Sequence, residues 1–319
     1  MNKENEKEPK DIVHDTVMIG AGPTNLTAAI YTTREDIETL VLDKGVIGGL
    51  AAVTDWIDNY PGFPDGIAGL DLSEKLQKQA ERFGAKIDFV GVESLAKKDN
   101  IIELQTTSGP IKAKTVLIAT GSDYKRVGCP GENEFYARGV HYCATCDGAF
   151  YRDKRLVVVG GGNSAVQETL FLTRYASHID LLVRSKFRAS DVLVQELEKH
   201  KDKVTVHLGT TTDSINGKDG KVVSVTGTKD GKKVELKTDG VFVFVGLKPN
   251  TEFLEGSGIE LDEIGMIKSD ESLQTNIKGI FAAGDVRSGA TMQIASAAGE
   301  GATAALSIRK YLEDMERNE

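Results

Sequence analysis

The stretch DTVMIGAGPTNLTAAI, residues 15–30, decides how this chain begins to fold. Its apolar first third predicts a buried strand that runs straight into a glycine turn, Gly20-Ala21-Gly22-Pro23, where a helix with small residues on its inner face begins. Such a turn lets the backbone approach a pyrophosphate and points the helix N-terminus at its negative charge. The sequence therefore predicts a dinucleotide-binding unit at the start of the chain.

An acid at the end of the next predicted strand supports this interpretation. The apolar run at residues 39–42 ends at Asp43, about 23 residues after Gly20. At this spacing a carboxylate can accept hydrogen bonds from the hydroxyls of a ribose. The alternative is a strand-end acid that contacts only water.

A second strand, turn and helix follow in the middle of the chain. Residues 155–159 are apolar after Arg155 and enter the turn Gly160-Gly161-Gly162-Asn163-Ser164-Ala165. A helix is expected at residues 164–175 and another buried strand at 179–183. Together they predict a second βαβ unit with a parallel sheet and a right-handed crossover.

Between the two glycine turns lies Cys143-Ala144-Thr145-Cys146-Asp147. Two thiols with two residues between them can close a small disulfide ring and exchange electrons in pairs. Half of a zinc site has the same spacing, but structural zinc takes four thiol or imidazole ligands. Because Cys129 is the only other cysteine and only His141 is near in sequence, the redox pair is favoured and no metal site is expected.

Bulk properties limit the other possibilities. A chain of 319 residues predicts about two domains. The charged start at residues 1–10 does not resemble a signal peptide, and no apolar run approaches the roughly 18 residues of a membrane span, so we expect a cytoplasmic protein without membrane association. The net charge of −9 argues against nucleic acid as a partner.

The remaining patterns predict how the two units are connected. A core-packing helix is expected at residues 70–83, and antiparallel strands around residues 222–225 and 234–236. Lys248-Pro249-Asn250 is expected to be a linker out of the second unit. If the alanine-rich helix predicted at residues 295–312 packs on the first unit, the second unit is an insertion in the first.

The chain contains six motifs in this order: Gly20-Ala21-Gly22-Pro23, Asn59-Tyr60-Pro61-Gly62-Phe63, Ala119-Thr120-Gly121, Cys143 to Gly148, Gly160 to Ala165 and Ala282-Ala283-Gly284-Asp285-Val286. Together they resemble the low-molecular-weight thioredoxin reductases, which are FAD-containing pyridine nucleotide-disulfide oxidoreductases.

The resemblance implies an α/β fold of two Rossmann-like dinucleotide-binding domains of the three-layer ββα type, the second inserted in the first. It implies a flexible N-terminal tail at residues 1–14, an FAD-binding domain at 15–124 and 250–319, and a pyridine-nucleotide domain at 125–249 that carries the cysteines.

The resemblance also implies the chemistry. Electrons would pass from NADPH through FAD and the Cys143–Cys146 pair to thioredoxin or a similar small redox protein, in a homodimer. Cys146 would face the flavin, Cys143 would attack the partner, and Asp147 would act as general acid and base. For Asp147 the alternative is a charge that only stabilises a helix N-terminus, and for His141 a structural role is favoured over a catalytic one.

By the same resemblance, two sets of residues are expected to bind cofactors. The flavin set is Gly20, Gly22, Pro23, Thr24, Asp43, Lys44, Gly49, Leu50, Asn59, Ala119, Thr120, Gly121, Gly284, Asp285, Gln293 and Ile294. The nicotinamide-dinucleotide set is Gly162, Asn163, Ser164, Arg184 and Arg188.

The chain departs from the family pattern at the second dinucleotide site. Where a His-Arg-Arg run, three spacer residues and another Arg are usual, it reads Arg184-Ser185-Lys186-Phe187-Arg188 after Val183, one residue short. The basic clamp for a 2′-phosphate is reduced, yet no acid marks an NAD site. Met292 and Leu50 also replace the usual Arg and Gln. The alternatives are therefore another electron donor (NADH, reduced ferredoxin or another carrier), a dithiol oxidase, or a flavin redox sensor without turnover.

Overall fold

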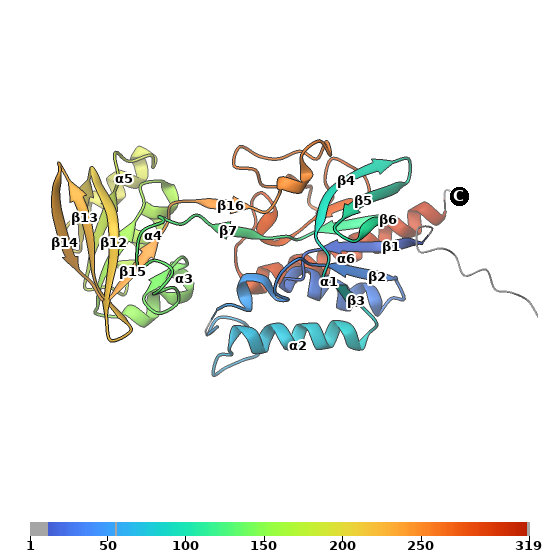
Figure 1. The fold of residues 1–319 in the computed structure, drawn as a ribbon, viewed down its shortest axis with the longest axis horizontal. Helices are drawn as coiled ribbons and strands as arrows, with labels where there is room; N and C mark the ends of the chain where they lie inside the picture. The colour runs from blue at the N-terminus through green and yellow to red at the C-terminus, as the bar shows by residue number, and fades with distance from the viewer. Residues whose placement is uncertain (1–11, 55, 318–319) are drawn as a thin grey trace, which may run out of the picture. The chain divides into compact units, whose positions relative to one another are not determined.

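The computed structural model describes residues 12–54 and 56–317, which form two compact units (Figure 1). Unit 1 contains the described residues up to Asp123 and from Lys248 onward, and unit 2 contains Tyr124–Leu247. Most of the tail expected at residues 1–14 lies outside the described residues, but the first strand begins at Val13, two residues earlier than Asp15.

The elements of unit 1 are β1 (Val13–Ile19), α1 (Pro23–Thr33), β2 (Thr39–Leu42), η2 (Gly49–Ala51), α2 (Gly69–Arg82), β3 (Lys86–Asp88), β4 (Val92–Lys98), β5 (Ile101–Thr106), β6 (Gly109–Ile118), η4 (Glu252–Leu254), β17 (Ile280–Ala282), η5 (Gly284–Val286) and α6 (Ile294–Glu316). The strands β7 (Ser122–Tyr124) and β16 (Leu247–Pro249) lie where the chain passes from one unit to the other.

The elements of unit 2 are β8 (Val140–His141), α3 (Ala144–Asp147), η3 (Gly148–Tyr151), β9 (Arg155–Val159), α4 (Asn163–Leu172), β10 (His178–Val183), α5 (Asp191–Glu198), β11 (Val204–Leu208), β12 (Thr210–Lys218), β13 (Lys221–Lys229), β14 (Lys232–Lys237) and β15 (Gly240–Val243).

Unit 1 has three layers because side chains alternate across its central parallel strands. Val17 and Ile19 of β1 pack with Leu104 of β5 in one core cluster. Met18, between them, packs with Ala28 of α1 and other helix residues in a second cluster on the opposite face. One face of the parallel strands is therefore covered by strands β4 and β5, and the other by helices.

Strand β6 joins two of these layers because it is long enough to serve both. Its first half pairs antiparallel with β5, and its second half pairs parallel with both β1 and β17. The last strand, β17, lies about 160 residues after β6 in sequence, so unit 1 closes only after the chain has returned from unit 2.

Unit 2 repeats this arrangement. Its parallel strands run in the order β11, β10, β9, β15 and β8. Val158 of β9 packs with Val166 of α4 on one face, while Val157 and Val159 pack with Val225 of β13 on the other. The three-stranded sheet β12-β13-β14 thus takes the place that β4 and β5 take in unit 1.

Several details differ from what the sequence predicted. The antiparallel pair around residues 222–225 and 234–236 is present, but β12, which pairs with it, and helix α5 were not predicted. The chain leaves unit 2 at Leu247, next to the expected linker at residues 248–250, and there β16 forms a two-stranded sheet with β7.

Helix α6 packs closely on α1 because a glycine lies at the contact. A Cβ at Gly301 would lie 2.2 Å from the carbonyl oxygen of Thr24, whereas a Cβ at Gly299, one half-turn away, would meet nothing within 4 Å. Backbone cannot move aside as a flexible side chain can, so only a glycine fits at the first position.

We therefore predict that Gly301→Ala lowers the free energy of unfolding by about 1–3 kcal/mol, since the two helices must separate. Gly299→Ala is the matched control and should be neutral or stabilising by up to about 1 kcal/mol, because alanine is the better helix former. Thermal or urea unfolding of the two variants measures the difference. Equal midpoints would show that the α1–α6 contact can relax.

Candidate functional site

The two glycine turns occupy the same place in their units, at the carboxyl ends of the parallel strands. A Cβ at Gly20 would lie 2.6 Å from the carbonyl oxygen of Ala119, just after β6. A Cβ at Gly160 would lie 2.3 Å from that of Phe244, just after β15. The first glycine of each turn is therefore pressed against a neighbouring strand end, and both have positive φ angles.

The last glycine of each turn is open instead. No atom would lie within 4 Å of a Cβ at Gly22 or Gly162. These residues are the N-caps of α1 and α4, and neither helix N-terminus has a side-chain cap. Uncapped helix amides next to open space can receive phosphate oxygens, so both turns fit the pyrophosphate of a dinucleotide.

Asp43 holds the first turn in shape. Its carboxylate accepts hydrogen bonds from the amides of Ala21 at 2.5 Å and Gly45 at 2.6 Å. A carboxylate can accept about four hydrogen bonds, so capacity for a ribose hydroxyl is left. Asn25 donates to the carbonyls of Ile19 and Gly20, and its Oδ1 is buried without a partner among the described residues.

Segments far apart in sequence meet at this edge of unit 1. Asn59 donates to Oε1 of Gln293 at 3.0 Å. Thr120 donates to the carbonyl oxygen of Asn250, whose side chain donates back to the carbonyl of Thr120. The structure thus brings together Asn59 and Gln293, two expected cofactor residues that are 234 positions apart.

Asp285 has the most unusual environment in unit 1. Its Oδ1 is buried and has no hydrogen-bond partner among the described residues. Burial, and then the nearby Glu300, raise the pKa of Asp285 to about 6. A buried acceptor without a donor is a position for a ligand hydroxyl, which fits the expected contact with the ribityl chain of FAD.

The other expected flavin residues belong to the same unit. A Cβ at Gly284 would lie 2.3 Å from Oγ1 of Thr24, so η5 touches the start of α1. Lys44, Gly49 and Leu50 are exposed, and Ala119 is buried. Pro23 is the first residue of α1, Ile294 is the first of α6, and Gly121 accepts from the amide of Asn250.

The basic segment of unit 2 lies against the second glycine turn. The carbonyl oxygen of Gly161 accepts the amide of Arg188 at 2.7 Å, and Oδ1 of Asn163 accepts the amide of Ser190 at 2.9 Å. Arg184 and Arg188 are exposed, and within the described residues their side chains form no ion pair or hydrogen bond. Ser164 is exposed beside Asn163. Among the described residues, the unpaired cations of Arg184 and Arg188 therefore lie in the segment that is bonded to the second glycine turn.

The two predicted redox cysteines form a disulfide, with their Cα atoms 5.3 Å apart. Cys143 is the N-cap of α3, and its Sγ accepts the amide of Cys146 at 3.1 Å. Cys143 is partly buried and Cys146 is exposed. No group of three or more His, Cys, Asp or Glu side chains that could hold a metal is present in residues 12–54 and 56–317.

The residue before Cys143 is anchored by a buried network that the sequence did not reveal. The hydroxyl of Tyr142 donates to Oε1 of Glu132 at 2.7 Å and accepts from Arg126 at 2.7 Å. Glu132 is 1% exposed and also accepts the amides of Val127 and Gly128. Burial and the bond to Glu132 raise the pKa of Tyr142. The only signal in the sequence is a glutamate within the otherwise breaker-rich segment at residues 128–134.

Two other residues of unit 2 with reactive side chains are His141 and Cys129. His141 is buried, and its Nδ1 lies 3.3 Å from Oδ2 of Asp147. Cys129 is half-buried against the core of unit 2, and burial raises its pKa to about 11, so it is a poor nucleophile.

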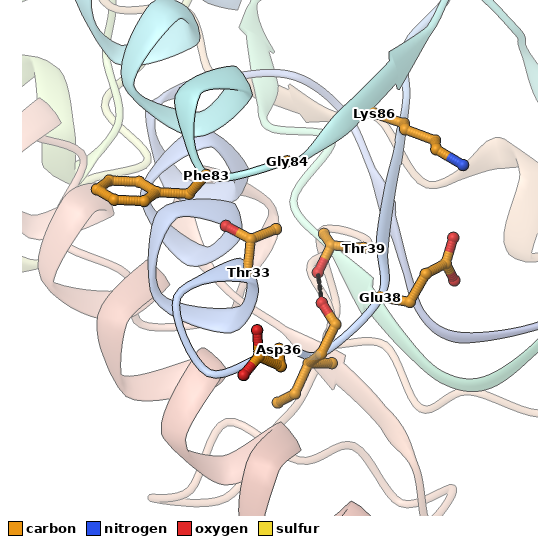
Figure 2. Close-up of a pocket in the computed structure, with 8 residues that line it drawn as sticks. Thr33, Asp36, Glu38, Thr39, Phe83, Gly84 and Lys86 are labelled. Carbon is orange, nitrogen blue, oxygen red and sulfur yellow. Dashed lines mark hydrogen bonds between the residues drawn. The ribbon is translucent and has the colours of Figure 1, made fainter.

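A pocket in unit 1 lies away from the glycine turn (Figure 2). Thr39, the first residue of β2, and Glu38 line it together with Phe83 and Lys86. It is therefore at the amino end of β2, whereas Asp43 follows the carboxyl end. Dinucleotides bind at carboxyl ends of parallel strands, so this pocket is not the cofactor site.

No helix of the described chain is long and apolar enough to cross a membrane.

Comparisons with known proteins agree with this geometry. Residues 14–301 match the family model described as pyridine nucleotide-disulphide oxidoreductase. The chain is 41% identical to thioredoxin reductase of Bacillus subtilis, covering 95% of this chain and 96% of that protein. It is 40% identical to a 34.2 kDa protein in the rubredoxin operon of Clostridium pasteurianum, covering 96% and 99%. The crystal structure of thioredoxin reductase from Streptococcus pyogenes has a TM-score of 0.90 at 38% identity, covering 95% and 99%.

The raised pKa of Asp285 should make the stability of the ligand-free protein depend on pH. Its folded pKa of about 6 lies above the ordinary 3.8, so the folded state binds more protons between these values and loses stability as the pH rises through this window. In protein freed of ligands, Asp285→Asn should be more stable than wild type above about pH 6, by up to about 3 kcal/mol, and equal to it below about pH 4. It should also hold flavin more weakly. Thermal unfolding across this range is the measurement.

Asp262 is a control because its pKa is lowered, so its effect on stability should depend on pH in the opposite direction. Burial opposes its ionisation, but hydrogen bonds from Ser288 and from backbone amides including that of Met266 lower its pKa overall. Asp262→Asn should therefore be less stable than wild type at neutral pH, with the difference shrinking as the pH falls. If Asp285→Asn behaved in the same way, the assigned environment of Asp285 would be incorrect.

Proposed function

The chain belongs to the pyridine nucleotide-disulphide oxidoreductase family and is a thioredoxin reductase of the low-molecular-weight class, and we propose that it carries electrons from NADPH through FAD to the disulfide of thioredoxin or a similar small redox protein. The observation that carries this proposal is the Cys143–Cys146 disulfide in a chain with two open dinucleotide turns.

The flavin site would be formed by the edge of unit 1. Gly22 and the uncapped start of α1 would receive the pyrophosphate, Asp43 a ribose, and Asp285 the ribityl chain. Gln293 is held by Asn59 and would lie along the ring system. When bound, FAD would relay two electrons from a reduced nicotinamide to the disulfide.

The thiol chemistry would be done by three residues of unit 2. Once reduced, Cys143 attacks the disulfide of the partner, and Cys146 resolves the mixed disulfide by attacking Cys143. Asp147 would take the proton of the attacking thiol and return it to the leaving sulfur of the partner. A homodimer in the cytoplasm remains our prediction from the family resemblance.

We predict that Cys143→Ser and Cys146→Ser each abolish disulfide reduction and leave flavin bound, because each sulfur performs a separate step. Flavin absorbance and reduction of added thioredoxin measure the two properties. Cys129→Ser is the matched control and should keep turnover, since its thiol is half-buried with a raised pKa. Substantial turnover in either variant of the pair would mean that the disulfide is structural.

A different electron donor is the second candidate, and the segment after β10 favours it. In the segment at residues 184–188 the cations that could receive a 2′-phosphate are Arg184, Lys186 and Arg188. Each lost charge-assisted hydrogen bond costs on the order of 1.5–3 kcal/mol, so affinity for NADPH would be low.

For the donor we predict a residual preference for NADPH over NADH with poor affinity for both. Arg184→Ala combined with Arg188→Ala should slow flavin reduction by NADPH roughly tenfold or more at low concentration and change reduction by NADH little. Lys218→Ala with Lys221→Ala removes the same charge from the β12–β13 turn of unit 2 and is the control.

Rapid-mixing measurements of flavin reduction against nucleotide concentration decide between the donors. If the double arginine variant is reduced by NADPH as fast as wild type, these arginines are not a nucleotide clamp. If neither nucleotide reduces the flavin but a low-potential protein donor does, unit 2 functions as a dithiol carrier for another electron source.

A further inference from the structure

A buried histidine lies two residues before the first redox cysteine. His141 is on β8, and its side chain is 8% exposed. The centroid of its ring lies 5.3 Å from that of Tyr151 and 5.2 Å from that of Phe242. Both ring nitrogens face polar atoms. Nε2 is 2.7 Å from the hydroxyl of Tyr151, and Nδ1 is 3.3 Å from Oδ2 of Asp147.

The surroundings determine which nitrogen carries the proton. A carboxylate only accepts hydrogen bonds, so the nitrogen that faces Asp147 must be the N–H. Nε2 then accepts from Tyr151. Burial, and then the charges of Asp147 and Asp239, raise the pKa of Tyr151, which keeps its phenol protonated as a donor. Asp239 itself accepts the amide of Arg155 at 2.9 Å.

We propose that His141 is a positioning residue for the thiol–disulfide exchange: its Nδ1–H, fixed by Tyr151, orients the carboxylate of Asp147 on the turn that carries both sulfurs. The amide of Asp147 bonds to the carbonyl of Cys143 at 3.1 Å, so the carboxylate belongs to the same turn as the disulfide. The inference rests on the proposed role of Asp147 as base.

The step that His141 serves is balanced in electrons and protons. The thiol of Cys143 gives its proton to Asp147 and attacks one sulfur of the partner disulfide, which breaks. Cys146 then attacks Cys143, forming the Cys143–Cys146 bond and releasing the partner sulfur. The partner gains two electrons, and its two sulfurs take the proton held by Asp147 and the proton of Cys146.

The test is a single turnover that needs neither a nicotinamide nor a protein partner. The flavin-containing protein is reduced with dithiothreitol, freed of it without oxygen, and mixed with excess hydroxyethyl disulfide between about pH 5 and pH 9. Acid quenching, alkylation and mass spectrometry then follow the loss of thiols. In wild type we expect the rate of thiol loss to fall at acidic pH, and Asp147→Asn should remove this dependence.

Two amide variants separate positioning from packing. The amide nitrogen of asparagine lies near the place of imidazole Nδ1, and that of glutamine near Nε2, while both lose the ring. His141→Asn should keep the wild-type rate of exchange, whereas His141→Gln should slow it roughly tenfold, because the carboxylate of Asp147 loses the N–H that orients it. Tyr151→Phe keeps an aromatic ring and should slow the exchange by less.

Each outcome decides the proposal. A slower exchange in His141→Gln and Tyr151→Phe but not in His141→Asn supports it. Equal losses of rate in both His141 variants, or no loss in His141→Gln, overturn it and leave the role of Asp147 intact. If the wild-type rate shows no fall at acidic pH that depends on Asp147, the assignment of Asp147 as base fails, and the positioning role of His141 fails with it. Neither outcome touches the two-cysteine chemistry, which the cysteine variants test separately.

Discussion

The structure depends on a close approach of backbone to backbone at the first glycine of each turn. At Gly20 and Gly160 the chain leaves a buried strand beside the end of its neighbour, at distances that no Cβ could share. This tight turn starts the following helix at the sheet edge with its amides uncapped, so the proposed phosphate site results from the packing of the sheet itself. Both units contain this turn, which supports the proposal that each binds a dinucleotide.

The sequence predicted what such local constraints determine. Glycine turns after strand-length apolar runs predicted the parallel strands, and the spacing of Cys143 and Cys146 predicted a disulfide, which the structure contains. Strand β12 was missed because its side chains are polar: Asn216 bonds across the sheet to Ser224 and Thr226, so no apolar alternation is visible. The contacts of Glu132 with Tyr142 could not be predicted either, because they depend on how a loop folds back.

The segment of unit 1 that carries Asp285 shows a conflict between stability and the proposed flavin binding. Glu300 accepts the amide of Gly284 at 2.7 Å and pairs with Arg287 through both of its oxygens, which fixes the segment that carries Asp285. The same carboxylate also makes ionisation of Asp285 less favourable. Arg287 offsets part of this charge, since its guanidinium is planar and bidentate. The cost of burying Asp285 would be offset by a ligand hydroxyl that donates to its unpartnered Oδ1.

The two functional parts of unit 2 differ in how firmly the fold holds them. The disulfide turn is tied to the core, because Ala144 is buried in the cluster around α4 and Tyr142 is bonded to Glu132. The basic segment is also held, but only through backbone amides that bond to Gly161 and Asn163. Within residues 12–54 and 56–317 the side chains of Arg184 and Arg188 make no bond that holds that arrangement, so they can change without loss of stability. Folding therefore constrains the disulfide turn, whereas the arginines proposed to bind the electron donor are free to vary.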